Sequence, residues 1–232
     1  MTWQLPLLGF LLGSIPFGLY IAKSQGIDIR EHGSGNIGAT NVFRVVGKKY
    51  GIICLILDFL KGFIPVVIAM NLCRLIGHEA MISLGFLQNL TIPFPESDRT
   101  LVQSIIVLTA FAAIMGHNYS PWVRFRGGKG IATSAGALTA LMPAGVVILI
   151  LVFIVVLKLT RYVSAASIAA AVSLPIITLS GSYFHGKIAN GEWNIPLFLF
   201  SLVAGFLAIF KHRSNIKRLF AGTENKVGTK KI

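Results

Sequence analysis

Residues 131–157, IATSAGALTALMPAGVVILILVFIVVL, form the longest uncharged apolar run of the chain, and the way this run is divided decides the fold. The run is longer than the ~20 residues that cross a hydrocarbon core. Pro143-Ala144-Gly145 interrupts it near its middle, and a proline removes a helical hydrogen bond. The run itself therefore allows two interpretations: one long tilted helix kinked at Pro143, or two short crossings.

The composition of the 232-residue chain is typical of a membrane protein. Hydrophobic residues make up 54% of it and charged residues only 12%, with a mean hydropathy of +0.75. A soluble domain carries about twice this charge. The net charge is +13, and the basic residues flank the apolar runs, as expected for membrane topology and contact with anionic lipids. Because no aromatic-interleaved basic stripe or zinc-finger spacing is present, we expect membrane lipids and no nucleic acid as partners.

The distribution of Lys and Arg favours one of the two interpretations of the central run. With six crossings, the two faces carry 9 and 11 of these residues, which is no asymmetry. A break at Pro143 places 17 on one face and 3 on the other, as the positive-inside rule prefers. The two helices that this break creates are short for a membrane crossing, because 12 to 15 residues span only about 18 to 23 Å.

We therefore predict an all-α integral membrane protein of seven transmembrane helices, some of them short. The N-terminus is expected outside, and the C-terminus and the glycine-rich loops in the cytoplasm. No internal repeat is evident, so residues 1–232 are expected to form a single polytopic domain. The expected spans are approximately 3–22, 50–73, 101–116, 129–142, 143–160, 163–181 and 194–210.

Three polar clusters interrupt this apolar chain. The first motif is Gly33–Arg44; the second is Gly116–Asn118 with Phe125–Thr133; the third is His212–Leu219 with Gly222 and Glu224. Each joins glycines, which expose backbone N–H groups, to fixed cations and small hydrogen-bonding side chains. Such a combination favours phosphate binding.

Neither glycine loop is a nucleotide-binding motif. Gly33–Gly38 matches G-x-G-x-x-G, but apolar helices flank it and no strand precedes it, which excludes a Rossmann fold. Arg126–Gly130 resembles a P-loop but lacks the upstream glycine and the Ser or Thr after Lys129. Either loop alone could merely contact lipid headgroups. Two loops with Arg44 and Lys129 favour a bound phosphorylated ligand.

The third motif places His212, Asn215 and Arg218 on one face of a helix that continues the last span. That face could offer a proton acceptor, an amide and a guanidinium to a ligand; a solvated basic tail is the alternative. Inside the second span, Asp58 and Lys61 are spaced to form an ion pair that orients the helix. The Cys and His patterns predict neither a disulfide between Cys54 and Cys73 nor a metal site.

All three motifs closely resemble the signatures of the bacterial integral-membrane acyl-phosphate:glycerol-3-phosphate acyltransferase family. The similarity extends from Gly13 to Glu224 and includes the run Leu57–Gly62. It implies seven helices with cytoplasmic motifs in the inner membrane. It also implies transfer of an acyl group from acyl phosphate to the 1-hydroxyl of glycerol 3-phosphate, with no cofactor, in phospholipid biosynthesis. Neither His117 nor His212 has an Asp five residues later, so the H-x-x-x-x-D base of soluble-type acyltransferases is absent.

From this resemblance and the cluster chemistry we assign the candidate site. The expected catalytic residues are Ser34, Arg44, Lys129, His212 and Asn215. The expected substrate-binding residues are Gly33, Gly35, Asn36, Gly38, Thr40, Asn41, His117, Gly127, Gly128, Gly130, Thr133, Arg218 and Glu224. Two other classes stay open: a transporter of phosphate or small phosphorylated solutes, and a noncatalytic lipid-binding scaffold. The sequence leaves acyl-chain preference and oligomeric state undefined.

Overall fold

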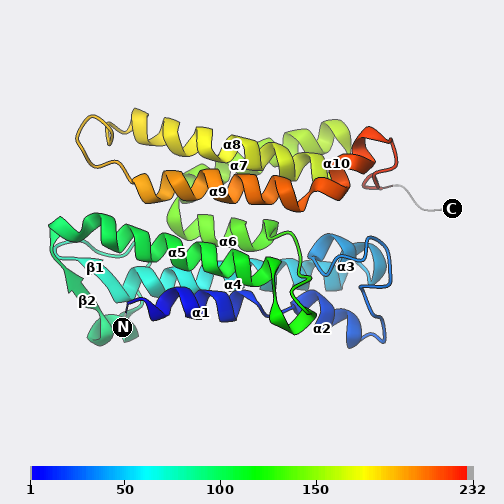
Figure 1. The fold of residues 1–232 in the computed structure, drawn as a ribbon, viewed down its shortest axis with the longest axis horizontal. Coiled ribbons are helices and arrows are strands. Elements are labelled where there is room, and N and C mark those ends of the chain that lie inside the picture. The colour runs from blue at the N-terminus through cyan, green and yellow to red at the C-terminus, as the bar shows by residue number, and fades with distance from the viewer. Residues whose placement is uncertain (1, 229–232) are drawn as a thin grey trace. The chain divides into compact units, whose positions relative to one another are not determined.

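The structure, a computed structural model, describes residues 2–228, and these form two compact units, residues 2–141 and residues 142–228 (Figure 1). Lys230 and Lys231, which were counted among the inner charges, lie outside the described residues. The expectation of a single polytopic domain stays a prediction.

Unit 1 contains six α-helices among its described residues. They are α1 (Gln4–Gly13), α2 (Phe17–Lys23), α3 (Ala39–Val45), α4 (Lys48–Leu72), α5 (Arg99–Asn118) and α6 (Ile131–Leu141). The break between α1 and α2 falls at Pro16, whose ring cannot continue the helical hydrogen bonding. Short 3-10 turns occupy Gly85–Leu90, Glu96–Asp98 and Pro121–Val123.

Glycines let the long helices of unit 1 approach closely. A side chain at Gly13 of α1 would collide with the Ala113 backbone of α5, and one at Gly116 of α5 with the Phe10 carbonyl of α1. The contact between α4 and α6 is built in the same way, with Gly62 against the Thr133 carbonyl. Small residues at such contacts are typical of membrane helices, where packing rather than hydrophobic burial drives association.

The predicted ion pair inside α4 is confirmed, and its lysine also bonds to the chain at the break between α1 and α2. Lys61 Nζ lies 2.8 Å from Asp58 Oδ1, and both side chains are 3% exposed. Lys61 also donates to the Ile15 carbonyl at 2.8 Å, next to the α1–α2 break. The two charges therefore neutralise each other, and Lys61 also satisfies a backbone carbonyl that the break leaves without a helical partner. Charged groups inside a membrane require such partners.

A small parallel sheet of β1 (Cys73–Leu75) and β2 (Ile92–Phe94) was not predicted. The sheet lies at one end of unit 1, whereas α2 and α3 lie at the opposite end (Figure 1). Buried Asn71 holds this region together: its amide donates to the Ile82 carbonyl and accepts from Leu84 N–H, both at 2.8 Å. Cys54 and Cys73 are unbridged, as expected.

Unit 2 contains four helices among its described residues: α7 (Pro143–Thr160), α8 (Val163–Phe184), α9 (Ile195–Lys211) and α10 (Arg213–Phe220). Helix α7 begins at Pro143, where the long apolar run was expected to break; Pro143 takes the N-terminal position that tolerates its missing N–H. The third-motif helix does follow α9, but it is bent by 55° at His212 instead of continuing straight.

The helices are those of an integral membrane protein. Within residues 2–228, five helical segments are long and apolar enough to span a membrane, and six if α9 and α10 count as one. Helix α6 is a shorter apolar helix. Counting it as a short crossing gives seven, and this count stays a prediction.

Candidate active site

The first-motif loop is organised around the side chain of Asn41. Its amide nitrogen donates to three backbone carbonyls, those of Ile29 (3.3 Å), His32 (3.0 Å) and Asn36 (2.9 Å). Its oxygen accepts from Ser34 N–H at 3.0 Å. Asn41 is buried, and these partners occupy both of its N–H donors and one of the two acceptor sites of its oxygen. The geometry therefore indicates that Asn41, expected to bind substrate, shapes the loop from beneath.

Two glycines and a second asparagine complete this loop. Gly33 and Gly35 have φ of 63° and 68°, a left-handed conformation that favours glycine. Asn36 Oδ1 accepts from Gly38 N–H at 2.8 Å and so closes the turn before α3. The side-chain amides of Asn36 and Asn41 therefore bond within the loop. The hydroxyls of Ser34 and Thr40 and the guanidinium group of Arg44 are exposed.

The second motif folds tightly onto His117. Gly128 N–H donates to the His117 carbonyl at 3.1 Å. A side chain at Gly128 would collide with the imidazole, and one at Gly127 with the His117 carbonyl. His117 is buried, and its Nδ1 lies 3.7 Å from Asp58 Oδ1. The glycine loop therefore packs directly on His117, and the expectation that His117 binds substrate stays a prediction.

Lys129 and Thr133 lie at the start of α6. Gly130, with φ of 79°, turns the chain into this helix, and a side chain there would collide with Asn118. Lys129 is partly buried. Thr133 is fully buried, and its hydroxyl has no hydrogen-bond partner among the described residues. The Thr133 hydroxyl is therefore a buried polar group that the described residues leave without a hydrogen-bond partner.

The first motif and the segment that leads into the second glycine loop meet in one hydrophobic cluster. Ile37 and Val42 of the first motif pack in the same buried cluster as Ile29 and as Val123, which lies just before the second glycine loop. Cys54 of α4 belongs to the same cluster. Shared burial therefore fixes the two motif loops side by side.

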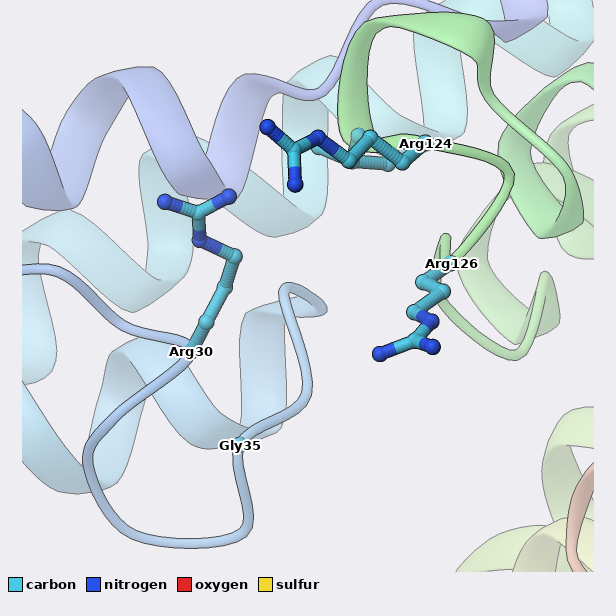
Figure 2. A pocket seen from close by; sticks show the side chains of 5 residues that line it. Arg30, Gly35, Arg124 and Arg126 are labelled. Atoms are coloured by element: carbon cyan, nitrogen blue, oxygen red, sulfur yellow. The ribbon is translucent and has the colours of Figure 1, made fainter.

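The surface above this cluster is hollowed into a pocket of about 470 Å³, lined by Arg30, Gly35, Val123, Arg124 and Arg126. Figure 2 shows Arg30 and Arg124 pointing toward each other across the opening, with Arg126 reaching the same space from the second-motif loop. The sequence reasoning counted these arginines for topology but did not choose them as site residues. Their signal was partial: Arg126 lies inside the second motif, but nothing in the sequence indicates the backbone turn that directs Arg124.

The third motif is organised by Glu224. Its Oε1 accepts from Asn215 at 2.6 Å and from Ser164 of α8 at 2.7 Å, and its Oε2 from Arg218 at 2.7 Å. Partial burial opposes ionisation of this carboxyl, but the three donors outweigh it and hold the pKa of Glu224 below its usual value. The geometry indicates that Glu224 positions the motif, and Ser164 is a contributor that the sequence reasoning missed.

His212 lies at the bend between α9 and α10. Its Nδ1 is 2.8 Å from the Ala208 carbonyl, which favours the tautomer that carries a proton on Nδ1. In that tautomer Nε2 is the basic nitrogen. That the third motif joins the other two in one site stays a prediction.

The chain is similar to known acyltransferases over nearly its whole length. The family described as "Glycerol-3-phosphate acyltransferase" matches residues 3–222. A glycerol-3-phosphate acyltransferase of Geotalea daltonii is 40% identical, over 97% of this chain and 98% of the relative. One of Aquifex aeolicus is 36% identical, over 96% and 97%.

Two solved structures have the same fold. One is PlsY (YgiH), an integral membrane glycerol 3-phosphate acyltransferase, in the glycerol 3-phosphate form; it matches with a TM-score of 0.77 and 36% identity, over 98% of this chain and 96% of that one. The lysophosphatidic acid form matches with a TM-score of 0.74. The resemblance seen in the three motifs is therefore confirmed: the chain belongs to the integral-membrane glycerol-3-phosphate acyltransferase family.

Proposed function

We propose that this chain transfers a fatty acyl group from acyl phosphate to the 1-hydroxyl of sn-glycerol 3-phosphate. The hydroxyl oxygen forms a bond to the acyl carbon, the bond from that carbon to the phosphate oxygen breaks, and inorganic phosphate leaves. The products are 1-acylglycerol 3-phosphate, a lysophosphatidic acid, and inorganic phosphate. The two solved relatives support the acceptor and the product, since they hold glycerol 3-phosphate and lysophosphatidic acid.

The observation that carries this proposal is the shared cluster under the first two motifs. Because Ile37, Val42 and Val123 pack together, two glycine loops with their cations lie side by side. The reaction brings two phosphorylated substrates together, and two such loops suit that need. Holding the hydroxyl within ~3–3.5 Å of the acyl carbonyl supplies much of the acceleration.

We assign the exposed motif residues to ligand contacts and the buried ones to holding the loops in shape. Ser34 and Arg44 are exposed, and we assign them to one substrate phosphate, with Arg44 binding bidentately. Lys129 and the N–H groups of its glycine loop, except that of Gly128, which donates to the His117 carbonyl, are assigned to the other phosphate. These donors also stabilise the oxyanion that develops during transfer. Asn41 and His117 hold the two loops in shape.

Phosphate is a good leaving group, so the reaction does not require a strong protein base. We assign the hydroxyl proton to the departing phosphate. His212, held by the Ala208 carbonyl, is the second candidate acceptor through Nε2. Asn215 and Arg218 are tied to Glu224, which fixes the helix that presents them.

We further propose that the motif loops face the cytoplasm of a bacterial inner membrane, with the N-terminus outside. The Lys and Arg count supports this orientation, since 17 of the 21 fall on the face of the motifs. Glycerol 3-phosphate is a soluble dianion, so a cytoplasmic site gives it access without crossing the membrane.

The test uses purified protein with labelled glycerol 3-phosphate and acyl phosphate, followed by measurement of phosphate release and lysophosphatidic acid. We expect the two products in equal amounts. Proteoliposomes loaded with the same labelled solute test for transport. Absence of product together with uptake of the solute would show a transporter instead; absence of both would leave the scaffold.

A further inference from the structure

The pocket lined by Arg30, Arg124 and Arg126 contains neither Arg44 nor Lys129 among its lining residues. Within residues 2–228, neither Arg124 nor Arg126 forms an ion pair, whereas Arg30 is tied to Asp28 by bonds of 2.9 and 2.5 Å. Asp28 therefore pairs with one of the three pocket guanidinium groups, and the other two have no ion pair among the described residues. The pocket retains an excess of positive charge at a surface that, of the assigned site residues, only Gly35 lines.

Two of the three pocket arginines, Arg30 and Arg124, are anchored through their chain neighbours. Ile29 and Val123 are each the chain neighbour of a pocket arginine, and both are buried in the cluster that joins the first two motifs. Tethering by Asp28 also fixes the Arg30 side chain. A preorganised cationic site binds more tightly, because less side-chain ordering must accompany binding.

The loop that carries Arg124 and Arg126 is fastened to the helix break of α1 and α2. Ser120 Oγ donates to the Ser14 carbonyl at 2.6 Å, and Trp122 Nε1 donates to Ser14 Oγ at 3.0 Å. Arg124 and Phe125 have φ of 54° and 60°, a conformation that costs energy for residues other than glycine. The fold maintains this strained turn, and the turn directs Arg124 over the pocket (Figure 2).

We propose that this pocket is a second anion site, which captures a phosphate monoester at the membrane surface before or after the acyl-transfer step. Its volume of about 470 Å³ is within the range of small-ligand sites. Guanidinium groups match phosphate oxygens bidentately, and two uncompensated arginines balance a dianion. Gly35, exposed at the pocket wall with φ of 68°, leaves room for close approach.

Two sources supply this chemistry: a soluble phosphate monoester such as glycerol 3-phosphate, and the headgroup of a monoacyl or diacyl phosphatidic acid. The inference rests on the proposed function only for naming glycerol 3-phosphate. The probe for the site itself is inorganic phosphate, whose binding is measured without turnover.

The experiment compares phosphate titrations of the full chain, in detergent, by calorimetry. Arg44→Ala/Lys129→Ala removes the assigned catalytic cations, and phosphate binding should persist in this variant. Addition of Arg124→Gln/Arg126→Gln should weaken the remaining binding at least tenfold. The matched control Lys48→Gln/Lys49→Gln removes two exposed positive charges of the same unit and should change the affinity less than twofold.

Loss of all phosphate binding in Arg44→Ala/Lys129→Ala would overturn the second site, as would unchanged affinity after Arg124→Gln/Arg126→Gln. The single variant Arg126→Gln provides the same comparison with a smaller expected loss, about threefold or more, if the combined variant does not fold. The lysine-substituted variant Arg124→Lys/Arg126→Lys should retain part of the affinity, because charge remains while bidentate binding is lost.

Competition identifies the source. Displacement of phosphate by glycerol 3-phosphate assigns the site to the soluble substrate; displacement in nanodiscs that contain phosphatidic acid, but not in nanodiscs of phosphatidylcholine, assigns it to a lipid headgroup. Displacement by neither would overturn the phosphate-monoester class. Failure of the wild type to form lysophosphatidic acid would overturn the proposed function but not these binding results.

Discussion

The first and third motifs hold their chains by opposite means. In the first, one buried neutral amide, Asn41, bonds to four backbone groups and shapes a loop. In the third, one carboxylate, Glu224, bonds to three side chains and ties α10 to the beginning of α8. In both motifs, the polar side chain with the most hydrogen bonds holds the chain in shape, whereas Ser34 and Arg44 of the first motif are exposed.

The largest effect should come from an exposed cation of the first motif. Arg44→Ala should lower acyl transfer by about 100-fold or more, since removal of one donor to a developing charge costs on the order of 10²–10³ in rate. Because Arg44 is exposed, the thermal unfolding temperature should change little. Lys48→Ala, a change of an exposed cation on α4, is the control; similar activity of the two variants would argue against a ligand contact by Arg44.

The next effect tests the buried amide. Asn41→Ala removes four hydrogen bonds and leaves polar backbone groups unpaired, which should cost about 2–4 kcal/mol of unfolding free energy. Unfolding titrations with SDS measure it. Asn36→Ala, which removes one such bond to Gly38, should cost about 1 kcal/mol. Equal costs would contradict the central place of Asn41 in the loop.

A smaller effect is expected for the carboxylate. Glu224→Gln keeps an acceptor for Ser164 or Asn215 but loses the charge that faces Arg218, so we expect a cost of about 1–2 kcal/mol. Asn215→Asp would place two carboxylates together and should be worse than Glu224→Gln. The reverse order would show that charge is not what holds this motif.

The smallest effect is a pH dependence confined to the third motif. The pKa of Glu224 is lowered in the folded chain, so its contribution to stability is complete above the ordinary value of 4.5 and is lost as the pH falls through the folded pKa. The difference in thermal unfolding temperature between wild type and Glu224→Gln should therefore be constant from pH 7 to about 5 and shrink below that. A constant difference down to pH 3 would contradict the assignment.

Sequence reasoning succeeded where one residue type has one physical consequence. Pro143 cannot continue a helix, and α7 begins there. Asp58 and Lys61, three residues apart in an apolar helix, have to pair, and they do. The motif residues also carried enough chemistry to identify the family.

What could not be predicted depends on contacts between distant parts of the chain. The Lys61 bond to the Ile15 carbonyl joins α4 to the break between α1 and α2, and nothing near either residue signals it. The left-handed turn at Arg124 is maintained by Ser14, more than a hundred residues earlier. The division of motif residues into supports and ligand contacts likewise required burial and bond partners, because Asn41 and Arg44 belong to the same motif.

The identity of the acyl donor separates the proposed reaction from the alternatives in a single assay. Purified protein is given labelled glycerol 3-phosphate with either acyl phosphate or acyl-CoA at the same concentration, and lysophosphatidic acid is measured. The account predicts product with acyl phosphate, matched by released phosphate, and none with acyl-CoA. Product from acyl-CoA, or none from acyl phosphate, would contradict it.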